Sequence, residues 1–479
     1  MGTFCMMRVQ DRRASPGRRC LGAAGLLALI LTALATAIVA AIVAQPASAA
    51  GGDLLWAKRY GTAVRPAWTL AVAAAPHGAV CVAGDRIGPT GVHMVLLRYR
   101  ANGRRTWVRQ YGATRSGEEF SAAVACDRRG NVVVAGYAER GLNDWDIVVI
   151  KYSPGGKRLW LRRYTGGAGG DADATAVAVD RYGNVYVTGT VKKPGGDTKV
   201  VTVKYSPSGK RRWTAVRGSE VLGGGFALPG VGFTVAGSAL DTYGNVYVCG
   251  TASWMTDERA VVMKFKRGDG RTPWARVDTP ALGEKSRATA IAVRGNLVVA
   301  SVSLVAGSDS HMGGLGYSRG GAPRYRTFYD EGPSDRVESS DVIVDAKGRA
   351  FVAGVASLTM GTQARSCVMR LLADGTWQST AAEPLDGDAR DLHLALGPAG
   401  AVYLAWADQW MDGATERRNI VVRRFSNSLN TRPWIKAWRG PGHDDDRPCG
   451  VVLGTTGGLY VAGTCRAASD QIVVLKLRR

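Results

Sequence analysis

Residues 51–479 are predicted to form an all-β structure, and three observations lead to that prediction. A unit of about 50 residues recurs along this part of the chain. Each unit contains four short apolar segments of strand length, separated by turns rich in glycine, proline and aspartate. Glycine is abundant, with 63 residues in a chain of 479. Four strands in each unit of this length are typical of a β-propeller, so we expect one ring of four-stranded antiparallel blades.

One aromatic residue marks the same place in every unit and sets the repeat. The intervals between successive markers run from 51 to 61 residues. The markers are Trp56, Trp107, Trp160, Trp213, Trp274, Tyr325, Trp377 and Trp434. Apolar first-strand segments recur with them, near Leu70, Ala123, Ala176, Val235, Ile291, Val342, Leu394 and Val451. The sequence therefore predicts eight blades.

Within a blade, each element has its own sequence signal. The clearest unit begins with an apolar first strand that ends before Asp180, where the turn Asp-Arg-Tyr-Gly-Asn follows. The aspartate is expected to cap this turn with its side chain, and Gly183 to supply a positive φ. The second and third strands are nearly continuous apolar runs, as expected between neighbouring sheets. The fourth strand alternates basic and apolar residues, which indicates an outer edge facing water.

The two ends of the repeat region complement each other. The last unit reaches Arg479 after its third strand, residues 471–477, and contains no fourth. At the other end, residues 53–60 (DLLWAKRY) have the pattern of a fourth strand without a blade of their own. Pairing of these two strands would complete the eighth blade and close the ring without an exposed sheet edge.

These motifs resemble the β-propeller repeat of bacterial surface proteins. The shared features are the Gly-rich loop with aspartate, the hairpin VDRYGNVYVTG at residues 179–189 and a VKYSPSG turn at residues 203–209. That family often has seven blades, whereas eight units are counted here. Residues 205–213 (YSPSGKRRW) are also similar to the tryptophan-docking turn of eight-bladed quinoproteins. This second resemblance implies that Trp160, Trp213 and Trp377 are structural and cover the seams between sheets.

The first fifty residues differ from the rest. Five arginines precede an uncharged apolar run at residues 21–43, and Ala47-Ser48-Ala49 follows. This order predicts a signal peptide cleaved near Ala49 or Ala50, with export to the cell surface or the medium. The alternative is an uncleaved anchor, because the apolar run is long enough to span a bilayer. Residues 51–479 are then the propeller domain, which we expect to be a monomer.

The chain carries a formal net charge of +23, of which the leader contributes +4. Propeller topology places the turns within strand pairs on one face and the remaining connections on the other. Lys-Arg pairs gather on the first of these faces, and acidic residues on the second. We therefore expect a basic face suited to an anionic partner and an acidic mouth opposite it. No nucleic-acid-binding module is present in the sequence, so no specific nucleic-acid partner is predicted.

Aromatic residues in the polar connections between second and third strands are the candidate binding residues. They are Trp145, Trp254, Met255, Trp410 and Met411. Such side chains can stack on sugar rings or accept apolar peptide side chains. The alternative is that each tryptophan folds onto its own blade.

A cluster of acidic residues, Asp444, Asp445 and Asp446, is the candidate metal site. Ca²⁺ takes several oxygen ligands, so this cluster could hold it. The alternative is a capping and hydrating role for these carboxylates, and no other cofactor is predicted. The five histidines show no zinc-ligand spacing.

Six cysteines lie beyond the leader, and two of them are candidates for a disulfide. Cys449 and Cys465 lie symmetrically about Gly457 in the last hairpin, which predicts that they face each other across it. Cys81, Cys126, Cys249 and Cys367 fall inside strands and are expected to be small core residues.

Two classes of function follow from the sequence. The leading prediction is a non-enzymatic binding or scaffold module for a glycan, a peptide or a cell-envelope polymer. The alternative is a quinone-dependent dehydrogenase-like enzyme, or another enzyme with its site at the mouth of the ring. The sequence contains no vicinal cysteine pair of the kind found in quinoprotein alcohol dehydrogenases.

Overall fold

The computed structural model confirms the all-β prediction. It describes residues 52–61, 71–88, 90–112, 117–141, 144–166, 170–192, 196–222, 230–329, 336–357, 364–384, 392–412, 415–441, 445–466 and 470–479. The predicted signal peptide, residues 1–50, lies outside them. The helices in the described residues are three short 3-10 turns: η1 (Pro76–Gly78), η2 (Ser219–Leu222) and η3 (Pro398–Gly400). None of the helices described is long and apolar enough to cross a membrane.

Strands in groups of four make up eight blades, numbered here along the chain. Blade 1 contains β2 (Ala71–Ala74), β3 (Val80–Gly88), β4 (Gly91–Tyr99) and β5 (Arg105–Tyr111). Blade 2 contains β6 (Glu119–Cys126), β7 (Val132–Gly141), β8 (Asp144–Tyr152) and β9 (Arg158–Thr165). Blade 3 contains β10 (Asp171–Val179), β11 (Val185–Lys192), β12 (Thr198–Tyr205) and β13 (Arg211–Arg217). Blade 4 contains β14 (Gly232–Leu240), β15 (Val246–Trp254), β16 (Asp257–Phe265) and β17 (Trp274–Val277).

The other four blades follow the same plan. Blade 5 contains β18 (Glu284–Arg294), β19 (Leu297–Ala306), β20 (Asp309–Ser318) and β21 (Pro323–Tyr329). Blade 6 contains β22 (Arg336–Val344), β23 (Ala350–Ser357), β24 (Arg365–Leu371) and β25 (Trp377–Pro384). Blade 7 contains β26 (His393–Leu396), β27 (Val402–Asp412), β28 (Thr415–Phe425) and β29 (Trp434–Trp438). Blade 8 contains β30 (Arg447–Leu453), β31 (Gly458–Arg466), β32 (Asp470–Arg478) and β1 (Leu54–Tyr60).

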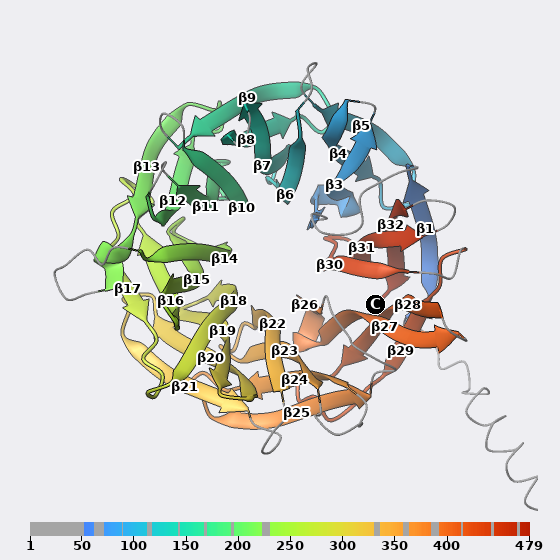
Figure 1. The fold of residues 1–479 in the computed structure, drawn as a ribbon. Coiled ribbons are helices and arrows are strands. Elements are labelled where there is room, and N and C mark those ends of the chain that lie inside the picture. Colours follow the sequence, from blue (N-terminus) through green and yellow to red (C-terminus); the bar gives the residue numbers. More distant parts are fainter. Residues whose placement is uncertain are drawn as a thin grey trace, which may run out of the picture. The chain divides into compact units, whose positions relative to one another are not determined.

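Within each blade the strands pair antiparallel, each with the next in order. One parallel residue pair, Ser310 with Arg336, joins blades 5 and 6 into one eight-stranded sheet, and an isolated parallel bridge links Arg418 of blade 7 with Asp445 before blade 8. First strands touch first strands around the whole ring, from β2 through β6, β10, β14, β18, β22, β26 and β30 back to β2. Figure 1 shows these strands nearest the centre of the ring formed by residues 52–479. The prediction of eight blades is confirmed.

The ring closes between the two ends of the domain, as predicted. β1 pairs antiparallel with β32, from Leu54 opposite Leu477 to Tyr60 opposite Ile472. Two backbone hydrogen bonds extend the pairing, from Gly52 N to Arg478 O (2.7 Å) and from Arg478 N to the carbonyl oxygen of Asp53 (2.8 Å). In Figure 1 the blue strand β1 lies beside the red strand β32. The outermost strand of blade 8 thus comes from the opposite end of the chain.

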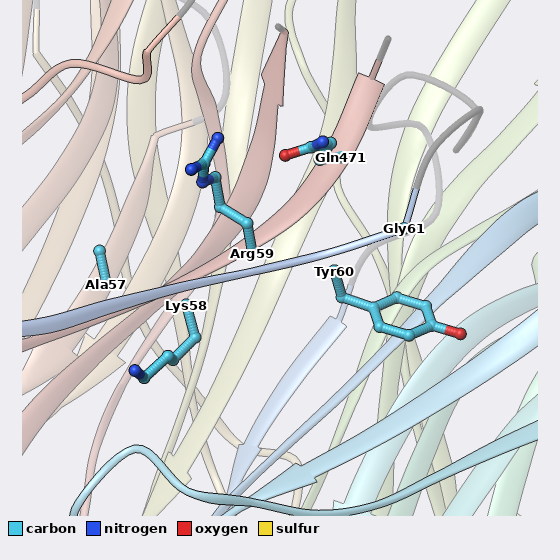
Figure 2. Close-up of a pocket in the computed structure, with 6 residues that line it drawn as sticks. All are labelled: Ala57, Lys58, Arg59, Tyr60, Gly61 and Gln471. Atoms are coloured by element: carbon cyan, nitrogen blue, oxygen red, sulfur yellow. The ribbon is translucent and has the colours of Figure 1, made fainter.

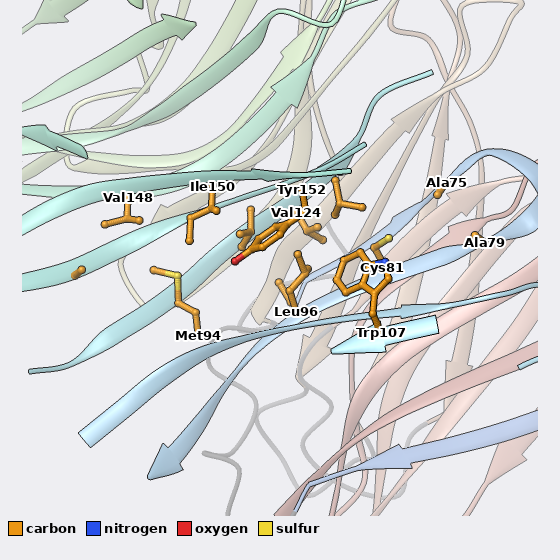
Figure 3. Packing of buried hydrophobic residues seen from close by; sticks show 14 residues of the cluster. Ala75, Ala79, Cys81, Met94, Leu96, Trp107, Val124, Val148, Ile150 and Tyr152 are labelled. Atoms are coloured by element: carbon orange, nitrogen blue, oxygen red, sulfur yellow. The ribbon is translucent and has the colours of Figure 1, made fainter. Parts of the chain in front are cut away.

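The hydrophobic core lies between the faces of neighbouring blades. Val124 and Ile150 of blade 2 pack with Leu96, Cys81 and Trp107 of blade 1 in one cluster of buried side chains, shown in Figure 3. Second and third strands are buried on both sides along most of their length, whereas in the outer strand β9 Trp160 is the buried residue and the others are half-buried or exposed. The apolar runs thus predict the burial of the inner strands, whereas the exposed Leu159 departs from the basic-apolar alternation expected of an outer strand.

The marker tryptophans join one blade to the next at its outer turn. The indole Nε1 of Trp107 donates to the carbonyl oxygen of Pro154 (2.8 Å), and that of Trp160 to Pro207 (2.9 Å). A glycine of positive φ leaves room for each ring: a Cβ on Gly209 would lie 2.8 Å from Cγ of Trp160. Trp213 docks in the same way, with Nε1 3.0 Å from the carbonyl oxygen of Arg267. The predicted structural role of Trp160 and Trp213 is confirmed.

Trp377 contacts Tyr329 of blade 5, with ring centroids 6.0 Å apart, but it does not dock on the turn of blade 7 as Trp160 and Trp213 dock on theirs. Its side chain is 51% exposed, and its Nε1 donates to Thr380 of its own strand (2.9 Å). The turn of blade 7 that should receive it has Leu429 at the position of positive φ, with φ +63. Leu429 is buried, so its side chain occupies the space that glycine leaves for an indole ring elsewhere.

Cys449 and Cys465 are both present as thiols, and they do not face each other. Cys449 lies at the β-bulge where the register shifts between Pro448 and Gly450, whereas Cys465 lies beyond the β30–β31 pairing. The expected cross-strand placement is therefore wrong, because the strands pair about Thr456 and not about Gly457, and the bulge shifts the register by one further residue. Of the other four, Cys81, Cys249 and Cys367 are buried as expected, and Cys126 is half-buried.

Candidate functional site

The alternating strand directions give the ring two faces, which we name by their connections. The turn face carries the turns between first and second strands and between third and fourth strands, such as residues 180–184 and 206–210. The loop face carries the connections between second and third strands and those from one blade to the next, such as residues 255–256 and 278–283.

On the loop face, Trp145 lies in strand β8 and not in a loop. It pairs with Glu139 across the extended β7–β8 hairpin. Its ring meets Tyr137 edge-on, with centroids 5.5 Å apart, and lies 5.8 Å from the ring of Phe120. All three side chains are half-buried. The result is an aromatic cluster on blade 2 that is packed together and still reaches solvent.

Trp254 and Met255 lie at the tip of the β15–β16 hairpin. Trp254 ends β15, opposite Asp257, and packs partly against the core between blades 3 and 4. The guanidinium of Arg259 lies over its ring at 5.2 Å. Met255 forms the turn itself, with φ +50, and its side chain is fully exposed. Trp254 is thus anchored on its blade while Met255 projects into solvent.

A hollow of about 560 Å³ opens beside Met255. It is lined by Thr256, Asp257, Arg259, Pro280, Ala281, Leu282, Gly283, Glu284 and Lys285. Leu282, from the connection between blades 4 and 5, is also fully exposed. The lining contains both acidic and basic side chains. Of the two exposed apolar residues, Leu282 lines the hollow and Met255 directly precedes the lining residue Thr256.

Trp410 and Met411 lie in strand β27, opposite Arg417 and Glu416 of β28. The expectation that they belong to an irregular loop is wrong, because pairing continues to Asp412 and Thr415 at the hairpin tip. Their side chains lie outside the described residues. Sequence patterns miss such extensions because polar residues can continue an exposed hairpin as readily as they form a loop.

The acidic residues proposed for Ca²⁺ have protein partners. Asp445 accepts hydrogen bonds from Arg418 (3.0 Å) and from Arg447 (2.9 Å). Burial opposes ionisation here, but these two guanidinium groups lower the pKa of Asp445. Asp446 is buried and accepts from the backbone N–H of Gly440. Asp444 lies outside the described residues, and Ca²⁺ binding stays a prediction.

Glu119, on the loop-face side of blade 2, lies inside a polar network and not at an open mouth. Glu119 is fully buried, and its Oε2 is 3.1 Å from Nδ1 of His93, whose Nε2 is 3.0 Å from the Thr90 hydroxyl. This hydroxyl–imidazole–carboxylate order activates nucleophiles in hydrolases. Here the hydroxyl lies on an exposed hairpin tip, whereas such chemistry depends on a site that excludes water. We therefore interpret the chain of contacts as a link between blades 1 and 2.

Asp171 and Asp173, at the start of strand β10, lie on the loop face, where the sequence predicts acidic residues. Burial, together with the neighbouring charge of Asp171, raises the pKa of Asp173. Asp171 also accepts a hydrogen bond from the backbone N–H of Trp145 (3.2 Å). An aspartate pair thus lies next to the aromatic cluster.

The turn face carries a group of cationic and aromatic side chains that the sequence reasoning did not single out. Tyr182 and Tyr243 occupy the same position in the first turns of blades 3 and 4, and both are more than half exposed. The guanidinium groups of Arg181 and Arg267 lie 4.7 and 5.3 Å from the Tyr182 ring. The sequence contains a signal for this group: a tyrosine recurs in the Asp-x-Tyr-Gly-Asn turns, although the turn geometry requires no aromatic residue at that position.

A further hollow, of about 410 Å³, lies along the closing strand. Figure 2 shows Arg59 and Lys58 projecting to opposite sides of β1, with Gln471 of β32 near Arg59. Because successive side chains of β1 point to opposite sides, the residues that line this hollow do not converge on one point. We assign no function to this hollow.

Comparisons with known proteins agree with the propeller architecture. The family model described as a beta-propeller repeat matches residues 161–190, within the clearest unit of the sequence pattern. The resemblance to β-propeller repeats is thus confirmed. No curated protein matches the chain.

Solved structures similar to this chain include Sqt1 from Chaetomium thermophilum, with a TM-score of 0.52 and 12% identity over 90% of this chain and 100% of that one. The β-propeller domain of the Trilobed protease from Pyrococcus furiosus has a TM-score of 0.40 and 7% identity over 74% and 93%. A europium-containing methanol dehydrogenase has a TM-score of 0.46 and 11% identity over 88% and 93%. At these identities the likeness concerns the fold alone.

Proposed function

We propose that this propeller is an exported, non-enzymatic binding module that recognises a glycan, a peptide or a cell-envelope polymer on its loop face. The observation that carries the proposal is the hollow between blades 4 and 5, with the fully exposed Met255 and Leu282 beside it. Large apolar side chains exposed together on a soluble surface are typical of an interaction site. Met255 is also adaptable, because its side chain is unbranched and polarisable.

The lining of the hollow supports recognition of a polar partner with apolar parts. Asp257 and Glu284 offer acceptors, and Arg259 and Lys285 offer donors, around the two apolar side chains. The aromatic cluster of Phe120, Tyr137 and Trp145 presents a second apolar element on the same face. A polymer that touches both elements would gain affinity from two weak contacts held on one rigid ring.

The test replaces the exposed apolar side chains and leaves the core intact. Met255→Ser with Leu282→Ser should reduce retention on isolated cell-envelope material by about tenfold, since each is an exposed anchor and not a core residue. The matched control is Leu55→Ser with Ile435→Ser, two half-exposed apolar residues on outer strands. The proposal predicts full retention for the control.

Substitution of the tryptophans is a second test of the loop-face site. Trp254→Ala with Trp410→Ala should weaken retention further, and thermal melting must show that the ring is still folded. Retention that is unchanged in both double variants would contradict a binding site on the loop face.

A further inference from the structure

On the turn face of blades 2 to 4, the aspartates of the first turns point inward while the cationic side chains point outward. Asp127, Asp180 and Asp241 are 6 to 8% exposed, because each carboxylate caps its own turn. Asp180, for example, accepts from the backbone N–H groups of Tyr182 and Asn184 and from the Asn184 side chain, at 2.8 to 2.9 Å. The negative charges of these turns are thus directed inward.

Cationic and aromatic side chains project outward from the same turns and from the β16–β17 turn of blade 4. We call them the Arg–Tyr patch, which consists of Arg128, Arg129, Arg181, Tyr182, Tyr243, Lys266 and Arg267, all of them exposed. They come from three successive blades. Asp127, Asp180 and Asp241 face inward, and the exposed Asp269 beside Arg267 pairs with Arg271 (3.3 Å), so the patch presents a net positive surface.

The patch is held in place by the seams between blades. The carbonyl oxygen of Arg267 accepts hydrogen bonds from Lys204 Nζ (2.7 Å) and from Trp213 Nε1 (3.0 Å) of the preceding blade. This fixes the backbone of Arg267 beside Tyr182, and its guanidinium lies over that ring. Arg319 lies over Tyr243 in the same way, at 4.5 Å. Guanidinium groups that are already positioned lose less entropy when they bind an anion.

Two hollows cross the patch and meet at Arg181 and Tyr182, which line both. One, of about 470 Å³, extends to Arg128 and Arg129 of blade 2. The other, of about 510 Å³, extends to Lys266 of blade 4. A row of cations along two adjoining hollows matches an extended polymer of repeating charge better than it matches a small ion.

The ionisation of nearby lysines is consistent with a positive potential. Burial, with the charges of Arg267 and Arg212 in addition, lowers the pKa of Lys204. Burial, with Arg319 and Lys266 in addition, lowers the pKa of Lys264. Asp180 and Asp241 oppose these shifts without reversing them. A bound anion would relieve this repulsion.

We propose that the Arg–Tyr patch binds a linear acidic polysaccharide. Carboxylate or sulfate groups on successive sugars would take bidentate hydrogen bonds from the guanidinium groups, and the sugar chain would lie along the two hollows without stacking on the tyrosines. Two guanidinium groups already lie over Tyr182, which leaves less ring face for a nucleobase to stack on. This site lies on the opposite face of the ring from the proposed loop-face site and does not depend on it.

The experiment measures binding of a fluorescent polygalacturonate fragment to the full chain by polarisation at low salt. The patch variant is Arg181→Gln, Lys266→Gln and Arg267→Gln, three exposed residues. It should bind at least about tenfold more weakly, since each lost cation removes one contact with the polymer. The control variant removes the same charge from exposed sites on the loop face, with Lys192→Gln, Arg365→Gln and Arg466→Gln, and should bind like the wild type.

Three further arms decide the identity of the partner. Heparin fragments should compete, because sulfate offers the same chemistry, and neutral dextran should not. Tighter binding of single-stranded DNA or of phosphatidylglycerol vesicles than of the polysaccharide would overturn the proposal. So would equal losses in the patch and control variants, which would indicate attraction to net charge alone. The Met255→Ser and Leu282→Ser variant should keep full affinity, which separates this site from the loop-face site.

Discussion

Among single residues, Asp341 on the first strand of blade 6 has a carboxyl group that connects two blades. Its Oδ1 accepts from the backbone N–H of Val342 and its Oδ2 from that of Leu394 in blade 7, both at 2.8 Å. Burial raises the pKa of Asp341 to about 6, and the two hydrogen bonds only moderate this rise. A carboxyl group that links two blades is therefore easier to bury in its protonated form.

The sign of the resulting pH dependence follows from the raised pKa. The folded state holds the Asp341 proton more tightly than the unfolded state, so this group favours folding below pH 4 and loses that contribution as the pH rises to about 6. Asp341→Asn cannot titrate. Urea unfolding at pH 4 and pH 6.5 should show a stability decline in the wild type that exceeds the decline in the variant by about 2 kcal/mol. Equal declines would show that this carboxyl does not titrate between the two pH values. The exposed Asp269→Asn serves as the control.

Among the elements, the seam between neighbouring blades is the unit that repeats most faithfully. A fourth-strand aromatic ring of one blade covers a glycine in the outer turn of the next, as in the pair Trp160 and Gly209. The glycine is needed twice, once for its φ of +83 and once for the space its missing Cβ leaves. The seam thus couples two residues that are far apart in the sequence.

This coupling can be measured with a double-mutant cycle. Gly209→Ala should destabilise the protein by more than Gly283→Ala, where φ is +86 and no atom lies within 4 Å of an added Cβ. The strain of the backbone is common to both, at about 1 kcal/mol, so the excess reports the clash with Trp160. In a Trp160→Ala background most of the excess should vanish, leaving the milder contact of the added Cβ with Arg162 Nη2 at 3.1 Å. Additive changes across the cycle would argue against the coupling.

The elements show which features the sequence could predict and why others escaped. The strand order, the Asp turns and the seams at Trp160 and Trp213 follow from local patterns that repeat. Trp377 escaped because its fate depends on Leu429, some fifty residues later, where glycine would have been required. The paired hairpin tip at Trp410 and Met411 escaped because polar residues such as Asp412 and Thr415 can continue an exposed hairpin without a periodic apolar signal. The Arg–Tyr patch escaped because its members come from turns of different blades.

For the whole molecule, the closure of the ring rests on one strand pair, β1 with β32. A chain that starts at Gly61 should leave the outer edge of blade 8 open, with Gly52 also missing from the ring of Trp434. We expect the Tm to fall by at least about 5 °C and the protein to aggregate, because an unpaired edge strand is exposed. A chain that starts at Gly51 is the control and should melt like the full chain.

Addition of a peptide covering residues 52–61 to the truncated chain separates loss of pairing from general damage. If closure depends on this strand, the peptide should restore the Tm as its concentration rises. A truncated protein that melts like the full chain would contradict the closure and the number of blades.

The docking of β1 on β32 also sets an order of events in time. A ribosome makes β1 first among the strands and β32 last, so the first strand of the domain has no partner until the rest of the chain exists. Any apparatus that releases or transports the chain must therefore handle a strand that stays unpaired throughout synthesis. The ring can therefore close only after the whole domain has been synthesised.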